Sequence, residues 1–278
     1  MSMEELIMAK ADKINASVPK AESEYIGDDG LLHCSVCHAP TQAVMWHPFK
    51  HKETKVGVIC DCRKKELYDH KERERQEERE RRRRICFAEA DMMGWTFAND
   101  DRRNAKLSDA MQNYVKHFDE FRKDGKGLLL FGSVGTGKTY YASAIANALI
   151  DIDYRVKMEK LSNIVNQLQK TFDEKDEIIR SINRYTLFIF DDLGAERNSE
   201  YMKEQIFNII DERYRSGLPF IVTTNLTPDQ IKKAQDISDT RIYDRILERC
   251  FPVKVDGGSR RRQNLKDTYG DVKEKLGL

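Results

Sequence analysis

The chain has 278 residues, 40% of them hydrophobic, and its 48 basic residues nearly balance 47 acidic ones. This composition is enough for a large buried core, with room for a domain of roughly 180 residues and smaller appendages. The net charge of +1 excludes global attraction to nucleic acid, so any such binding must come from local patches. Because the sequence has neither a membrane-spanning apolar run nor a signal-peptide core, we expect a cytoplasmic protein with no membrane partner.

Residues 1–30 are expected to form a short helix followed by a turn. Apolar residues recur at roughly helical spacing between residues 2 and 16, although a frayed terminus is an alternative because nothing caps the segment firmly before Pro19. The sequence Gly27-Asp-Asp-Gly30 then predicts a turn.

Four of the six cysteines have the spacing of a metal site, which we place in a module of residues 31–65. Two residues separate Cys34 from Cys37, so both thiolates can reach one Zn²⁺ ion, and Cys60 and Cys62 follow as a second pair. A site closed by four protein ligands has no open position for water. The zinc would therefore be structural and would fold a module too small to fold otherwise.

Two candidate strands, residues 42–46 and 55–59, would bring the cysteine pairs together as a hairpin-based zinc ribbon. The second pair has one intervening residue, which is tighter than usual, and four cysteines without metal are a further alternative. The tight spacing leaves room for a histidine in place of one cysteine, from among His33, His38, His47 and His51.

Residues 66–94 are expected to form a charged linker helix. Between Arg63 and Arg84 nearly every residue is charged, and acids repeatedly precede bases by four residues, which favours a solvated, rod-like helix. The run Arg81–Arg84 leaves nucleic-acid binding open as an alternative. Apolar residues resume at Ile85, so we expect the helix end to dock onto the next domain before Gly94.

The strongest motif of the chain is a phosphate loop. It follows an apolar run at residues 128–131, a predicted strand, and precedes an alanine-rich helix former at 140–150. Glycines let backbone N–H groups converge on phosphate oxygens, Lys138 would contact the β- and γ-phosphates, and Thr139 would offer its hydroxyl to Mg²⁺. A glycine-rich turn that happens to fit is the alternative. The predicted ATP-binding residues are Gly132, Ser133, Val134, Gly135, Thr136, Gly137, Lys138 and Thr139.

Strands and helices alternate along the rest of residues 95–262. This alternation predicts an α/β domain with a parallel sheet and helices on both faces. A helix at 110–122 comes before the loop. Strands are expected at 155–158, 186–192 and 220–225, and helices at 161–171, 176–183, 201–216 and 238–249.

Polar residues end two of these strands, where ligands bind in a parallel sheet. Asp191 ends a Walker B strand and would hold Mg²⁺, and Asp192 would orient or deprotonate the attacking water. Glu196 is a second candidate for that role. Asn225 would hold the water against the γ-phosphate. A helix N-cap and a turn are the structural alternatives for the Asp pair and for Asn225.

These motifs, in their order and spacing, resemble those of the DnaC/IstB-like AAA+ ATPases over about residues 95–262. The resemblance implies a P-loop AAA+ fold and Mg²⁺-dependent ATP hydrolysis. It also implies that Arg241 or Arg245 reaches a neighbouring subunit's γ-phosphate and that Arg260 contacts the nucleotide. Arg241 and Arg245 share one helix face with Arg249, but an ordinary solvated stripe would look the same. The motifs are residues 132–139, 188–196, 223–226, 241–245 and 258–260.

Family members with a cysteine module ahead of the ATPase look like DnaC/DnaI-type helicase loaders of Gram-positive bacteria and their phages. The resemblance implies that the zinc module binds the replicative hexameric helicase and that the ATPase self-assembles on single-stranded DNA. The DNA surface is predicted in the insert 157–175. This surface contains Lys157, Lys160, Lys170 and Lys175 beside Phe172. Residues 263–278 are expected to be a basic tail, as part of the segment 257–278, which has six Lys or Arg against three acids.

Two other functions stay open. A transposition-helper ATPase would have the same fold, and an ATP-gated adaptor with little hydrolysis is favoured by Asp192, where many such ATPases carry Glu. A protein unfoldase is excluded because no glycine for an aromatic-Gly pore loop occurs between Gly137 and Gly194. A GTPase is excluded because the chain has no Asn-Lys-x-Asp guanine-binding motif.

Overall fold

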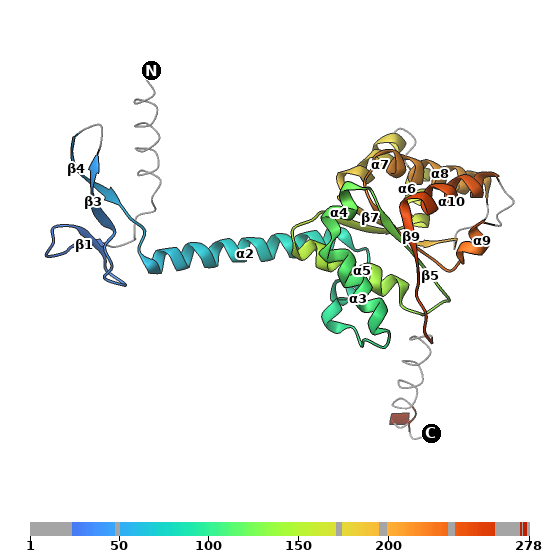
Figure 1. Ribbon diagram of the computed structural model, residues 1–278, viewed down its shortest axis with the longest axis horizontal. Coiled ribbons are helices and arrows are strands. Elements are labelled where there is room, and N and C mark those ends of the chain that lie inside the picture. The colour runs from blue at the N-terminus through green and yellow to red at the C-terminus, as the bar shows by residue number, and fades with distance from the viewer. Residues whose placement is uncertain are drawn as a thin grey trace, which may run out of the picture. The chain divides into compact units, whose positions relative to one another are not determined.

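The computed structural model describes residues 24–47, 51–170, 174–194, 199–232, 237–258, 273 and 275–276. Its contacts divide the chain into two compact units, Met1–Glu77 and Glu78–Leu278, which are described separately (Figure 1). The predicted domain limits at residues 30, 65, 94 and 262 stay predictions. The helix expected at 2–16, most of the tail, and Phe172, Glu196 and Arg260 lie outside the described residues.

The first unit contains two antiparallel hairpins. Strands β1 (Glu24–Ile26) and β2 (Leu32–Cys34) pair around the predicted turn at residues 27–30. Strands β3 (Gln42–His47) and β4 (Lys52–Gly57) form the second hairpin. The prediction placed the second strand at 55–59; it begins earlier because the ladder continues to the pair His47–Lys52. The hairpin β1–β2 was not predicted.

Helix α2 (Asp61–Cys86) begins in the first unit and ends in the second. Two of the expected ion pairs four residues apart form, Glu78–Arg82 at 3.0 Å and Glu80–Arg84 at 3.5 Å. Arg81 instead pairs with Glu78, three residues earlier, at 2.9 Å. Exposed pairs of this kind each contribute little to stability, so their contribution to the helix is small.

The predicted docking of the α2 end is confirmed. Arg82 donates to the Asp153 carbonyl at 2.7 Å, and Arg83 donates to Asn147 Oδ1 at 3.1 Å and pairs with Asp151. Two arginines of the basic run thus lie against the carboxyl-terminal end of α5 (Lys138–Asp151), where the helix dipole favours cations. These two side chains are engaged within the protein and do not form an open surface for nucleic acid.

The second unit contains a five-stranded parallel sheet in the order β6-β7-β8-β5-β9, so the predicted α/β class is confirmed. The edge strand β9 was missed because Pro252 argues against a strand. After the end of α2, the described elements of the second unit are, in chain order, η1 (Ala90–Gly94), η2 (Phe97–Asn99), α3 (Ala105–Lys116), α4 (Phe118–Lys123), β5 (Gly127–Phe131), α5, β6 (Val156–Lys160), α6 (Leu161–Lys170), α7 (Lys175–Ser181), η3 (Ile182–Arg184), β7 (Leu187–Leu193), α8 (Glu200–Arg215), β8 (Phe220–Thr224), α9 (Pro228–Lys232), α10 (Ile237–Arg249) and β9 (Cys250–Lys254).

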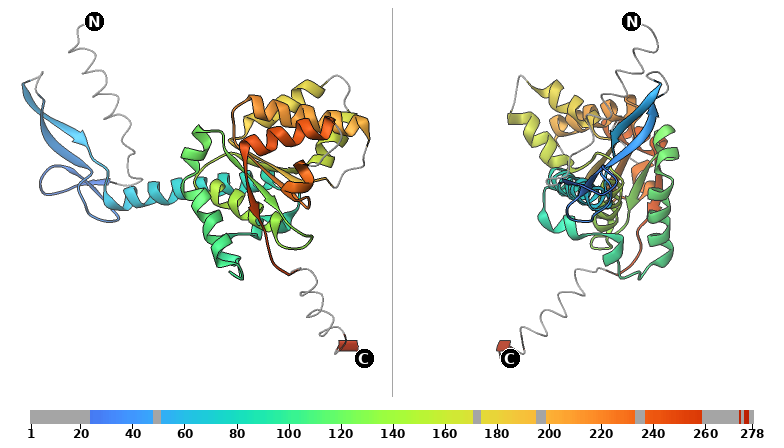
Figure 2. Two further views of the ribbon diagram at one scale, coloured as in Figure 1. Left: turned by 45° about the vertical axis from the view of Figure 1, so that its right-hand side comes forward. Right: turned by 90° about the vertical axis from the view of Figure 1, so that its left-hand side faces the viewer.

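Helices cover both faces of this sheet, as Figures 1 and 2 show. Leu128 and Leu130 of β5 belong to a core shared with α3, α4 and α5, whereas Leu129 between them belongs to a core shared with α6, α8 and α10. This alternation follows from the two-residue period of a strand. The single helix expected at 110–122 is two helices, α3 and α4. The chain turns between them at His117, whose backbone N–H and ring Nδ1 both contact the Asn113 carbonyl.

Arg213 ties together the segments that precede β7 and β8. Its side chain is wholly buried, and its guanidinium donates to four carbonyls. Because burial disfavours the charged form, it lowers the pKa of Arg213 to about 9. The guanidinium therefore fixes the starts of the two strands whose far ends carry the candidate site. The acceptors are the carbonyls of Ile182, Tyr185, Thr186 and Pro219, at 2.7 to 3.3 Å.

A close approach of two backbones at Gly127 gives a stability prediction. A Cβ added at Gly127 would lie 1.7 Å from the Phe220 carbonyl oxygen of the neighbouring strand. We expect Gly127→Ala to lower the free energy of unfolding by roughly 1–3 kcal/mol or more, because β5 and β8 must separate. Gly94→Ala is the matched control, since its Cβ would meet no atom within 4 Å. Equal urea midpoints for the two variants would contradict this account.

Candidate functional site

The phosphate loop has the backbone conformation that its sequence predicts. Gly135 and Gly137 have φ angles of 84° and 102°, in the region that glycine adopts without steric cost. Gly137 is also the N-cap of α5, so the loop leads directly into the amino-terminal end of that helix. A helix start after a loop of this kind offers free N–H groups and a partial positive charge, which suit an anionic ligand.

Lys138 connects the loop to β8. It is only 7% exposed, and its ammonium donates to the Gly132 and Ser133 carbonyls, both at 2.9 Å, and to Asn225 Oδ1 at 2.7 Å. The structure thus brings together two residues that the sequence places 87 positions apart. The ammonium lies where a ligand held by the loop N–H groups would meet it.

Asp191 is buried beside the start of α5. Its Oδ1 accepts a hydrogen bond from the Thr139 hydroxyl at 3.1 Å and a second from the Thr223 hydroxyl at 2.6 Å. Burial raises the pKa of Asp191, while the two hydroxyl donors act in the opposite direction. A carboxylate and a hydroxyl at this distance supply the oxygen ligands that Mg²⁺ prefers, so the donors present fit that ion. Thr223 is included in the predicted motif of residues 223–226, but the sequence analysis assigned it no role of its own.

Asp192 sits in a bulge of β7. Its φ of 65° is in the left-handed region, and the pairing of β7 with β8 shifts between Phe190 and Leu193. Its backbone N–H donates to the Thr223 hydroxyl at 2.9 Å. A bulge of this kind redirects a side chain, and Asp192 lines the same cavity as Lys138 and Asp191.

These residues line a cavity of about 580 Å³ at the carboxyl ends of the strands. Further residues line this cavity that the sequence analysis did not assign to a nucleotide site, among them Trp95, Tyr140 and Lys160. Lys160 was expected on a DNA-binding surface, but it lines this cavity and pairs with Glu89 at 2.9 Å. Lys157 of the same predicted surface donates to the Ile85 carbonyl at 2.9 Å. The two lysines therefore have partners within the second unit and are not a free basic patch.

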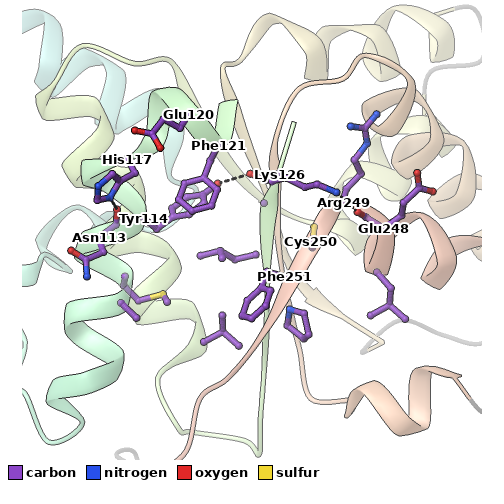
Figure 3. A pocket seen from close by; sticks show the side chains of 17 residues that line it. Asn113, Tyr114, His117, Glu120, Phe121, Lys126, Glu248, Arg249, Cys250 and Phe251 are labelled. Atoms are coloured by element: carbon purple, nitrogen blue, oxygen red, sulfur yellow. Dashed lines mark hydrogen bonds between the residues drawn. The ribbon is translucent and has the colours of Figure 1, made fainter. Parts of the chain in front are cut away.

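A larger cavity of about 880 Å³ lies elsewhere, between α3–α4 and the starts of β5 and β9 (Figure 3). Aromatic side chains including Tyr114, Phe121 and Phe251 line it. Its lysine, Lys126, donates to the Glu248 carbonyl at 2.8 Å. It has no phosphate loop and no buried carboxylate, so we place the candidate nucleotide site in the smaller cavity.

The arginines of α10 differ in their surroundings. Arg245 pairs with Asp211 of α8, and its guanidinium lies over the Phe207 ring at 4.7 Å. Arg249 lies over the Tyr214 ring at 4.9 Å. Arg241, one turn earlier, is exposed. The helix face is therefore not a uniform solvated stripe, because two of its three arginines are held by α8.

The four predicted cysteines converge in the first unit. Cys34 ends β2, Cys60 precedes α2 and Cys62 lies in the first turn of α2, so the tight second pair is explained by a helix start. All four sulfurs lie within 4.8 Å of one another. Sulfurs bound about 2.3 Å from a tetrahedral zinc ion stand about 3.8 Å apart, so the cluster fits Zn²⁺. Cys86 and Cys250, the remaining two, are buried in the second unit.

Local hydrogen bonds favour the thiolate form of Cys34 and Cys37, whereas hydrogen bonds with Cys60, Cys37 and Cys34 raise the pKa of Cys62. Backbone N–H groups of Cys37 and Val36 lower the pKa of Cys34 to about 7, and the Ala39 N–H lowers that of Cys37. Two of the alternative ligands have other partners. His33 bonds Asp29 and the His38 carbonyl through its two ring nitrogens, and His38 Nδ1 contacts the Tyr25 hydroxyl.

The geometry of the cysteine cluster predicts one zinc ion per chain. Metal analysis of freshly purified, reduced protein should find a molar ratio near one, and Cys34→Ser together with Cys37→Ser should abolish it. Chelation should unfold the first unit and leave the unfolding transition of the second unit in place. The second unit has its own core, and its cysteines Cys86 and Cys250 are not in the cluster. A metal-free protein with a folded first unit would contradict the prediction.

Comparisons with known proteins agree with this arrangement. The chain is 25% identical over 190 residues to the replicative helicase loader DnaI of Bacillus subtilis, covering 63% of this chain and 61% of that protein. It is 25% identical over 141 residues to the replicative helicase loader DnaC of Escherichia coli, covering 49% of this chain and 56% of that protein. The chain thus spans about three fifths of these relatives' lengths.

A crystal structure of DnaI superimposes with a TM-score of 0.54 at 26% identity, covering 65% of this chain and 99% of that one. This likeness confirms the AAA+ P-loop fold that the motifs predicted. The profile of the family described as IstB-like ATP binding protein matches residues 61–268, about three quarters of the chain. The chain therefore belongs to the IstB-like ATP binding protein family.

Proposed function

We propose that this protein is an ATP-dependent helicase loader in DNA replication. Its second unit hydrolyses ATP and self-assembles on single-stranded DNA in the cytoplasm, and its cysteine module binds the replicative hexameric helicase. The observation that carries the ATPase part is the meeting of Lys138, Asn225, Thr139 and Asp191 at one edge of the sheet. The loader part is supported by the likeness to DnaI and DnaC, whose names give that role.

The residues of the cavity divide the work of ATP hydrolysis. The loop N–H groups from Gly132 to Thr139 hold the phosphates, and Lys138 neutralises their charge. Thr139 and Asp191 would hold Mg²⁺, which would supply positive charge to the bound phosphates. Asp192 orients or deprotonates the attacking water, and Asn225, already bonded to Lys138, places that water beside the γ-phosphate.

Glu196 remains a proposed second group for orienting the attacking water, and Arg260 remains a proposed contact to the nucleotide. The cysteine cluster of Cys34, Cys37, Cys60 and Cys62 holds a structural Zn²⁺ and presents the β3–β4 hairpin. Two large apolar side chains of that hairpin, Met45 and Trp46, are 59% and 61% exposed. Exposed apolar groups on a small module suit a protein partner.

The contrast between the α10 arginines predicts which one reaches a neighbouring subunit. Arg241 is exposed, whereas Arg245 is bound to Asp211 in its own chain. Arg241→Ala should leave ATP binding and the unfolding midpoint unchanged and should lower turnover by up to roughly 10³-fold, the effect of a finger supplied in trans. Arg245→Ala should instead lower the unfolding free energy by about 1–3 kcal/mol, because it removes one of the two arginine partners of the Asp211 carboxylate and leaves only Arg215. Unchanged turnover in Arg241→Ala, measured at a protein concentration that permits assembly, would rule out this assignment.

Affinity capture tests the loader proposal against its alternatives. The immobilised full-length protein should retain the purified hexameric replicative helicase of Bacillus subtilis, and the Cys34→Ser, Cys37→Ser variant should lose it while still binding ATP. Capture of a transposase in place of the helicase would favour a transposition helper. Helicase capture without measurable ATP turnover would favour an ATP-gated adaptor. No retention of the helicase by the wild-type protein would contradict the loader proposal.

A further inference from the structure

Lys160 is a second cation at the nucleotide cavity. It is the last residue of β6 and pairs in register with Asp191 of β7. Its ammonium donates to Glu89 Oε1 at 2.9 Å, and both side chains are partly exposed, at 42% and 54%. Lys160 and Glu89 line the same cavity as Lys138, Asp191 and Asp192.

The Lys160 ammonium interacts with the Glu89 carboxylate and with the carboxylates of Asp191 and Asp192. The hydrogen bond that Lys160 donates to Glu89 raises the pKa of Lys160, and the carboxylates of Asp191 and Asp192 raise it further. One ammonium therefore lies between a carboxylate on one side and the candidate Mg²⁺ and water site on the other. A partly exposed lysine–carboxylate pair contributes about 1 kcal/mol or less, so a stronger anion in the cavity can displace Glu89.

Glu89 belongs to the segment between the end of α2 and η2. This segment is fastened to α5 at several points: Asn147 donates to the Met92 and Trp95 carbonyls at 3.0 Å, and Tyr140 donates to the Thr96 carbonyl at 2.8 Å. Glu89 lies three residues beyond the last residue of α2 and reaches the cavity through Lys160. A change in the partner of Lys160 would therefore act directly on the segment that follows α2.

We propose that Lys160 is a second positioning cation for the terminal phosphate of ATP and that Glu89 competes with this phosphate for its ammonium. ATP binding then releases Glu89 and loosens the segment that follows α2. The inference rests on the proposed ATP binding. ADP, which lacks the terminal phosphate, leaves the Glu89 pair in place, so the two nucleotides have different affinities for the two arrangements, as a switch requires.

A double-mutant cycle of nucleotide binding tests the inference. Dissociation constants for ATP and ADP, with Mg²⁺, would be measured for Lys160→Met, Glu89→Gln and the double variant. Lys160→Met should weaken ATP binding about tenfold and ADP binding far less, since it removes one charge-assisted contact to the terminal phosphate. Glu89→Gln should tighten ATP binding about threefold because it frees Lys160, and the double variant should bind like Lys160→Met.

Lys157→Met is the matched control. Lys157 lies on the same strand and bonds the Ile85 carbonyl near the α2 end, but it does not line the cavity. Its affinities for both nucleotides should equal those of the wild type. A second readout is backbone amide hydrogen exchange of residues 85–95, which should increase with a non-hydrolysable ATP analogue in the wild type and not in Lys160→Met.

The outcomes separate this inference from the proposed function. Wild-type ATP affinity in Lys160→Met, or a tightening by Glu89→Gln that persists in the double variant, would overturn the inference and leave the ATPase intact. A wild-type chain that binds ATP no better than Lys138→Ala would overturn both. Thermal unfolding of each variant shows whether a change in affinity arises from misfolding.

Discussion

The candidate site depends on one carboxylate that is almost completely withdrawn from water. Burial of Asp191 without partners would cost several kcal/mol, so its position is stable only while hydroxyl groups donate to it. Thr139 of α5 and Thr223 of β8 provide those donors. The need to satisfy Asp191 therefore holds the start of a helix and the ends of two strands together, and the cavity forms where they meet.

The same strands are held at their other ends by different means. Arg213 donates hydrogen bonds to the carbonyl groups that precede β7 and β8. Because Gly127 has no side chain, β5 can approach β8 closely. Neither residue lies near the phosphate loop. Their effect on the site is to fix the lateral spacing of three strands, which in turn sets the distance from Lys138 to Asn225.

Charged side chains in the second unit have two kinds of role. Arg83 and Arg245 bind acidic partners on neighbouring helices and hold those helices in place. Lys138 and Lys160 lie in the cavity and are held by groups that a phosphate could replace. Residue type alone does not separate these roles. What separates them is whether the partner lies inside the cavity or away from it.

The sequence by itself determined the features whose chemistry is local. The phosphate loop needs glycines, a lysine and a threonine at fixed spacing between a strand and a helix, and a metal site of the predicted kind needs paired cysteines. The residues of the loop and of the cysteine cluster could therefore be predicted. The parallel sheet followed from the alternation of apolar runs, and Asp191 and Asn225 followed from its strand ends. Each of these inferences uses a spacing or a period of neighbouring residues.

Only the tertiary structure decided which distant groups meet. The Thr223 donor, the Glu89–Lys160 pair, the ion pair of Arg245 with Asp211 and the pairing of β9 with β5 join residues that are 32 to 123 positions apart in the sequence. The sequence alone does not show whether a given lysine, arginine or threonine side chain has a partner in the folded protein. Their roles depend on the burial and charge around them, which arise only when the sheet and its helices have packed.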